Sequence, residues 1–138
     1  MIRVRQVEIE ALTFSQYDNG VSEIVYHEST ERAVNGFFHF VNMVIKETPP
    51  SQTIYLLSDL TQTGHLPLRD HYAKIAKLNT HYHPDERPNA RFANIYPAVT
   101  LKQKLILEFM RSLDMPNVAL DMFAAEERNR AIAWLLSV

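Results

Sequence analysis

The chain has 138 residues, of which 46% are hydrophobic and 22% are charged, and its formal net charge is −2. This length and composition predict a single globular domain over residues 1–138. The slightly negative charge excludes the basic surface that nucleic acids and anionic lipids select, so no nucleic-acid partner is expected.

Cysteine is absent, and only three glycines occur. Without cysteine the chain has neither disulfides nor thiolate ligands, which is typical of a cytoplasmic protein. Three glycines do not provide a Gly-rich phosphate loop. The apolar runs are far shorter than the ~20 residues of a membrane-spanning helix, and no signal-peptide core precedes the first strand pattern. We therefore expect a cytoplasmic protein with no membrane insertion and no cofactor.

Alternating apolar and polar residues predict a first strand over Arg5–Phe14. Residues 17–20 (YDNG) form a turn signal, and a second strand is expected over Ser22–His27. These two strands would make an antiparallel N-terminal hairpin. Ser29 or Thr30 is then expected to cap a long helix that ends before two consecutive prolines.

That helix carries more aromatic residues than one buried stripe needs. Phe37, Phe38, His39 and Phe40 are consecutive, and Phe38 and Phe40 point to different sides of the helix. Two interpretations follow. Either the helix lies between the core and a second surface, which would be a homodimer or ligand surface, or it is a wide apolar helix packed within one layer.

Further strand–helix units are expected after the prolines. The apolar run Ile54–Ser58 predicts a strand covered on both faces, and Leu66-Pro67 predicts the start of a helix that runs to about Asn79. A strand is expected over Arg91–Tyr96. Thr100 is expected to cap a helix whose large apolar residues point inward, namely Leu101, Leu105, Ile106, Phe109 and Met110.

The C-terminal residues predict a final strand and helix. Val118–Phe123 is expected as a short buried strand, and an acidic turn over residues 124–127 opens the helix. This helix is expected to pack on the sheet through Ile132, Trp134 or Leu135, and Leu136. The elements together predict an α/β fold of the order β-β-α-β-α-β-α-β-α, with one mixed, mainly parallel sheet.

In this order and pattern the chain resembles the STAS superfamily, and within it the SpoIIAA-like branch of small stand-alone domains. The matching features are the N-terminal strand pair followed by Ser29-Thr30-Glu31-Arg32 and a long helix, and the strands over residues 54–59 and 92–95. The segment Phe123 to Leu135 also matches, with an acidic helix start and an Ala-x-x-Trp-Leu-like close. The resemblance covers most of residues 5–137.

The resemblance implies a non-enzymatic regulatory or ligand-binding domain. In anti-sigma-factor antagonists, a serine in an Asp-Ser-Ser-Gly-like turn is phosphorylated to switch a partner; this turn lies at a helix N-terminus after the central strand. The corresponding stretch here is Asp59–His65, where Thr61 and Thr63 precede Gly64 and no Asp-Ser pair occurs. A plain binding domain is therefore expected in preference to a phosphoswitch.

The same stretch is the candidate site from the residues alone, because open α/β sheets bind ligands at the carboxyl ends of their strands. Its members are Asp59, Thr61, Thr63, Gly64 and His65. At this edge, residues 59–66, we expect a protein partner or a small ligand, and exposed N–H groups of the following helix would favour an anion or a phosphorylated side chain. The alternative is that Asp59 and the threonines only satisfy backbone groups of the loop and helix end.

The alternative function is a small enzyme or metal-binding protein that uses His and Asp residues between positions 59 and 85. His81 and His83 could present two imidazoles on one side of an extended segment, with Asp85 nearby. A third strong ligand is not recognisable by spacing, so no metal site is expected.

An acid–base group is the other form of this alternative. Asp59, Asp70 and His71 could meet in the fold, because a histidine oriented by a carboxylate transfers protons near neutral pH. No nucleophile elbow and no recognisable Ser-His-Asp context accompany these residues. Catalytic residues are therefore not expected.

Overall fold

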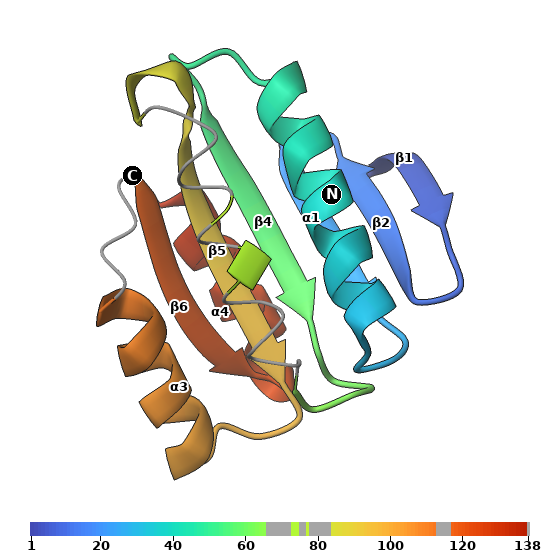
Figure 1. The fold of residues 1–138 in the computed structure, drawn as a ribbon, viewed down its shortest axis with the longest axis vertical. Helices are drawn as coiled ribbons and strands as arrows, with labels where there is room; N and C mark the ends of the chain where they lie inside the picture. The colour runs from blue at the N-terminus through green and yellow to red at the C-terminus, as the bar shows by residue number, and fades with distance from the viewer. Residues whose placement is uncertain (66–72, 75–76, 78–83, 113–116, 138) are drawn as a thin grey trace.

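The computed structural model describes residues 1–65, 73–74, 77, 84–112 and 117–137. These residues form one six-stranded sheet in which the strands follow one another in sequence order, β1-β2-β3-β4-β5-β6 (Figure 1). The first two pairs are antiparallel and the other three are parallel, so the predicted α/β class and mixed, mainly parallel sheet are confirmed. The strands are β1 (Arg3–Glu8), β2 (Leu12–Tyr17), β3 (Val21–Tyr26), β4 (Thr53–Asp59), β5 (Asn89–Tyr96) and β6 (Val118–Ala124).

The single strand predicted over Arg5–Phe14 is wrong, because the structure divides this stretch into β1 and β2. The chain reverses between them, and the Ile9 backbone N–H donates to the Leu12 carbonyl at 3.0 Å. The turn contains neither glycine nor proline, and its apolar residues continue the alternation of the strand. Period-two alternation is a local signal and does not report a reversal of direction. The N-terminal part is therefore three antiparallel strands, of which β2 and β3 form the predicted hairpin.

Helix α1 (Glu31–Glu47) lies across the front of the sheet in Figure 1. Thr30 is its N-cap, as expected, because the Thr30 hydroxyl accepts from the Ala33 N–H at 3.3 Å. At the other end the Thr48 hydroxyl donates to the Val44 carbonyl at 2.6 Å. These caps satisfy backbone groups that the helix ends leave open.

The aromatic residues of α1 belong to the core. Phe37, Phe38 and Phe40 are only 5%, 7% and 3% exposed, so the structure favours the wide, buried helix over an aromatic surface. Phe40 stacks on Phe14 of β2 with ring centroids 4.6 Å apart. Gly36 permits the close approach of α1 to the chain between β1 and β2, since a Cβ there would lie 3.0 Å from Ile9 Cδ1.

Helix α4 (Arg128–Leu136) follows a short 3₁₀ turn, Ala125–Glu127, and packs behind the sheet on the face opposite α1 (Figure 1). Ala131 and Leu135 are fully buried there, while Ile132 and Trp134 are partly buried against the same cluster. The Arg91 guanidinium of β5 lies over the Trp134 ring at 4.4 Å. Leu136 is 37% exposed, so its predicted place in the core is wrong: it lies beside Leu135 on the helix but turns toward solvent.

Helix α3 (Leu101–Ser112) lies alongside β6, the last strand of the sheet (Figure 1). Met110 is buried and Ile106 is partly buried, as expected. The inward orientation expected for Leu101, Leu105 and Phe109 is wrong, because they are 72%, 62% and 50% exposed. A helix at the end of a sheet has a neighbouring layer on one side only.

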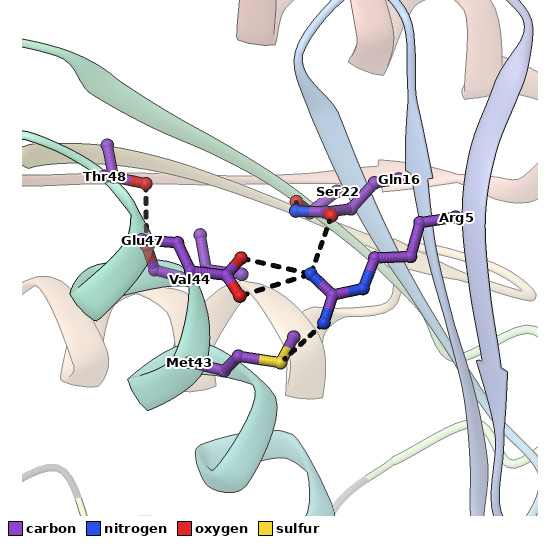
Figure 2. A network of polar contacts seen from close by, with 7 residues as sticks. All are labelled: Arg5, Gln16, Ser22, Met43, Val44, Glu47 and Thr48. Carbon is purple, nitrogen blue, oxygen red and sulfur yellow. Dashed lines mark hydrogen bonds and ion pairs between the residues drawn. The ribbon is translucent and has the colours of Figure 1, made fainter.

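The outer edge of β1 is tied to α1 by a polar network centred on Arg5 (Figure 2). Arg5 Nη1 lies 3.1 Å from Glu47 Oε2 and 3.4 Å from Gln16 Oε1, and its Nη2 lies 3.2 Å from Met43 Sδ. The Arg5–Glu47 pair is about half exposed, so its net contribution to stability is small. Its role is to position the first strand.

Backbone groups on the outer edge of β6 are hydrogen-bonded to nearby side chains. Arg111 of α3 donates to the Leu120 carbonyl at 2.9 Å, the Met122 N–H donates to Asp121 Oδ1 at 2.8 Å, and the Ala124 N–H donates to Glu127 Oε1 at 3.0 Å. Unpaired backbone groups on an edge strand are templates for another strand. In β6 three of these backbone groups already have side-chain partners, so they are not open to another strand.

Two further expectations concern the rest of the chain. The helix expected from Leu66-Pro67 to about Asn79 falls largely outside the described residues, among which Ala73, Lys74 and Lys77 are helical. Within the described part of the chain, no helix combines the length and the apolar character that crossing a bilayer requires.

Candidate functional site

The loop that follows β4 is held in shape by its own hydrogen bonds. Asp59 Oδ1 accepts from both the backbone N–H of Thr61 (2.9 Å) and its hydroxyl (2.6 Å). The Leu60 N–H donates to the Ile95 carbonyl of β5 at 2.8 Å, and the Gly64 N–H donates back to the Leu60 carbonyl at 2.7 Å. Gly64 has a φ of +79°, which glycine adopts without strain. Asp59 and Thr61 therefore do satisfy loop groups, as the structural alternative expected.

The other predicted site residues differ in accessibility. The Thr63 hydroxyl is buried and, within the described structure, has no hydrogen-bond partner. His65 is exposed, and its backbone carbonyl accepts from the Ser29 hydroxyl at 2.7 Å, which links the loop to the segment before α1. A kinase would reach Thr63 only after the loop had opened.

His27, immediately after β3, connects the loop to β2. Its Nδ1 lies 3.0 Å from Gln62 Oε1, and its Nε2 lies 2.7 Å from the Thr13 hydroxyl. With Nδ1–H donating to the Gln62 amide oxygen, the neutral ring accepts the Thr13 hydroxyl at Nε2.

Beside the loop, on the sheet face opposite α1, two carboxylates converge on Arg128, the first residue of α4. The Glu23 side chain is only 6% exposed; its Oε2 forms an ion pair with Arg128 and has no other polar partner among the described residues. Asp59 Oδ2 lies 3.9 Å from Arg128 Nη1. The Tyr17 hydroxyl donates to Glu23 Oε1 at 2.9 Å. Burial, and then this hydrogen bond, raises the pKa of Tyr17, so the phenol remains a donor at neutral pH.

The charge arrangement of this group indicates a structural role. Arg128 is already shared between Glu23 and Asp59, so an incoming anion would have to compete with two carboxylates. Removing the arginine would leave a buried carboxylate without its counter-charge, which is strongly destabilising. The group holds the start of α4 against β3 and β4, directly beside the candidate loop.

The described residues contain no assembled metal site. Over residues 1–65, 84–112 and 117–137 no three His, Asp or Glu side chains converge as metal ligands. Asp85 is exposed. Asp70, His71, His81 and His83 lie outside the described residues, so the meeting of Asp59 with Asp70 and His71 stays a prediction.

Sequence reasoning placed Asp59 at the site but missed its neighbours. Tyr17 reads as a turn residue, Glu23 and His27 read as residues of the second predicted strand, and Arg128 reads as an ordinary surface arginine. Their common signal is topological. Once β3 and β4 are paired in parallel, His27 and Asp59 must lie at the same edge of the sheet.

Comparison with known proteins adds no relative: neither a family model, nor a curated protein, nor a solved structure matches this chain. The class is therefore defined by the fold alone. It is an α/β domain with a three-stranded antiparallel part and a parallel part in one sheet.

Proposed function

We propose that the chain is a regulatory or interaction domain, related to the STAS superfamily, that binds a protein partner or a small ligand at the loop after β4. The observation that carries the proposal is the fixed backbone of this loop at the carboxyl edge of the parallel strands. Hydrogen bonds from Leu60 to β5 and from Gly64 to Leu60 hold it. A preformed loop loses little conformational entropy when it binds.

The side chains that the loop exposes are suited to polar recognition. Gln62 and His65 are exposed, and together they offer amide and imidazole donors and acceptors. The neighbouring Ser29 and His27 hold the loop from outside, so Gln62 and His65 project from a supported surface. The buried Glu23 carboxylate and its partly exposed partner Arg128 serve the support and leave recognition to Gln62 and His65.

The decisive experiment compares partner capture by matched double variants. Gln62→Lys with His65→Glu changes the proposed surface, whereas Ser51→Glu with Gln52→Lys introduces the same two groups at exposed positions before β4, at the opposite end of that strand. Cross-linking capture from native cells with quantitative mass spectrometry should lose a specific partner about tenfold in the first variant only, as loss of a specific polar contact does. Equal capture by both variants would reject the site, provided their melting temperatures match that of the parent chain.

Regulation by phosphate is the finer version of this proposal and concerns Thr61. A phosphate there would replace the hydrogen bond to Asp59 by repulsion between two anionic groups, and the loop would have to rearrange. Phosphopeptide mapping of the protein from its own cells tests this. If Thr61 is unmodified under all growth conditions, regulation by phosphate is rejected, and the loop remains a proposed binding site.

A further inference from the structure

Strand β1 is one edge of the sheet, and its outer backbone groups are open. The Ile9 N–H donates to the Leu12 carbonyl of β2 at 3.0 Å, so the backbone at Ile9 faces inward. Antiparallel strands alternate between residues that bond to the neighbour and residues that face away from it, so Glu8 and Gln6 direct their N–H and carbonyl groups outward. In the described sheet no strand lies beyond β1. These outward groups are a template for another strand.

The side chains along this edge form a self-complementary row. Arg3, Gln6 and Glu8 are exposed and lie opposite alternate residues of β2, because the register of β1 shifts after Arg3. Their partners are, in the same order, Tyr17, Ser15 and Thr13. Gln6 is therefore the centre of the row, with a cation two positions away on one side and an anion two positions away on the other. In an antiparallel pair of β1 strands with a twofold axis at Gln6, Arg3 of each copy lies opposite Glu8 of the other.

Two exposed apolar residues flank the row and meet in the same register. Ile2 is 69% exposed and Ile9 is 42% exposed. Backbone hydrogen bonds to β2 continue the ladder through both residues, so they lie one position beyond Arg3 and Glu8. The twofold axis at Gln6 then places Ile2 of each copy opposite Ile9 of the other. Cross-strand pairs of apolar residues and of opposite charges both stabilise a sheet.

Like charges are kept apart or compensated in this register. The two Arg3 side chains lie four positions apart, about 14 Å along the strands, and so do the two Glu8 side chains. The two Arg5 side chains come closer, at diagonal positions roughly 7–8 Å apart. Each Arg5 is already paired with Glu47 of its own chain at 3.1 Å (Figure 2). No two like charges of the β1 strands therefore lie directly opposite each other.

The contacts that the row makes within one chain are compatible with a second copy. Arg3 donates to Gln6 Oε1 at 2.8 Å, and Gln6 donates to Glu8 Oε1 at 3.4 Å, both at exposed positions. Arg3 also interacts with the Tyr17 hydroxyl. A guanidinium has five N–H donors and a carboxylate accepts on two oxygens, so Arg3 and Glu8 retain these contacts while they pair across the axis. The association requires only that the outer backbone groups are open.

We propose that β1 is a homodimer interface in which two copies pair their β1 strands antiparallel about Gln6 and join their sheets into one. Strand β1 lies at the rim of the molecule, where a second copy has access (Figure 1). Helix α1 contacts β2, so the two α1 helices are separated by at least three strand spacings, about 14 Å, and do not collide. A six-residue strand makes a contact smaller than a standard stable interface, so the dimer is weak and reversible.

The opposite edge of the sheet does not extend this assembly. Outer backbone groups of β6 are already bonded to Arg111, Asp121 and Glu127. The twofold pairing uses the β1 edge of both copies, so the association closes at two copies and does not continue into a fibre.

Because the chain contains no cysteine, single cysteine variants report directly on this register. Gln6→Cys should form a disulfide-linked dimer under mild oxidation, because opposite residues that exchange hydrogen bonds have Cα atoms about 5.5 Å apart. Arg3→Cys alone and Glu8→Cys alone should not, because each lies about 14 Å from its own symmetry copy. An equimolar mixture of these two variants should form the mixed disulfide. Equal self-cross-linking by all three variants, or none by Gln6→Cys, would overturn the proposal.

Sedimentation equilibrium on the cysteine-free chain tests the charge pairing independently. Glu8→Arg should weaken association about tenfold, because two pairs of like charge replace two pairs of opposite charge. Arg3→Glu should do the same, and the double variant Arg3→Glu with Glu8→Arg should restore association. Lys102→Glu, a charge reversal on α3, should leave it unchanged. All these residues are exposed, so unchanged melting is the folding control. A chain that stays monomeric at millimolar concentration overturns the dimer, and so does a double variant that fails to restore it.

Discussion

Helices α1 and α3 carry similar apolar patterns and end up in different environments. Both contribute to the same core cluster, α1 with seven buried residues and α3 with Met110 and partly buried Ile106. Helix α1 lies over the middle of the sheet, whereas α3 lies beside the last strand (Figure 1). The apolar content of a helix therefore does not report how much of it is covered. Position in the sheet decides that.

The largest expected effect is the difference in the free energy of unfolding between a substitution in α1 and one in α3. Phe40→Ala removes a ring stacked on Phe14 and should lower the free energy of unfolding by about 4 kcal/mol. Leu105→Ala should change it by no more than about 0.5 kcal/mol, because Leu105 is mostly exposed. Urea unfolding of both variants measures the difference. Similar losses for the two would mean that the Leu105 side chain is covered.

Helix α4 supplies an intermediate case on the other face. Trp134 is partly buried and lies under Arg91, so Trp134→Ala should cost about 2 kcal/mol, below the ~3–5 kcal/mol of a fully buried aromatic residue. The neighbouring Leu136→Ala is the control, with an expected change below about 0.5 kcal/mol. Both values come from chemical denaturation. A loss below ~1 kcal/mol at Trp134 would place this residue at the periphery of the second core.

The smallest expected effect concerns a buried tyrosine hydroxyl beneath α1 and whether it is hydrogen-bonded. Tyr26 is fully buried, stacks beside Phe37, and its hydroxyl has no hydrogen-bond partner in the described structure. Tyr26→Phe removes that unsatisfied group and should raise the free energy of unfolding by up to about 1 kcal/mol at pH 7. A clear loss of stability would show that the hydroxyl is hydrogen-bonded, for instance through a buried water.

The same variant has a signature at alkaline pH. Burial raises the pKa of Tyr26 well above the usual tyrosine value of about 10. The unfolded chain therefore loses this proton first. Ionisation of Tyr26 leaves the free energy of unfolding unchanged below pH ~10 and lowers it as the pH rises further. Denaturation series at several alkaline pH values should show a shallower decline for Tyr26→Phe than for the parent chain.

The fold could be predicted where a local signal coincides with an element. The Thr30 cap, the aromatic run of α1 and the apolar run of β4 each correspond to what is found. A strand is also found at Val118–Phe123, but of these residues only Phe123 is buried, because β6 is the last strand of the sheet. The β1–β2 reversal could not be predicted, since its turn has no residue with special backbone preferences. The exposure of Leu101, Leu105 and Phe109 could not be predicted either, because helical periodicity identifies a face and not the layer that covers it.

The candidate site was predictable only through its first residue. Asp59 directly follows an apolar strand, which is a signal readable in sequence. Glu23 and Arg128 come together through strand pairing and the return of α4 behind the sheet, and neither event leaves a mark in the local sequence. Long-range ion pairs of this kind need the three-dimensional fold.

The consecutive order of the strands has a consequence for biosynthesis. Every strand pairs only with its neighbours in sequence, so no late strand has to enter between two earlier ones. Each emerging strand can dock on the current edge and become the next edge, and each step closes only one connecting segment. The process stops at β6, whose outer groups are taken by Arg111, Asp121 and Glu127. The chain can thus assemble its sheet in the direction in which the ribosome releases it.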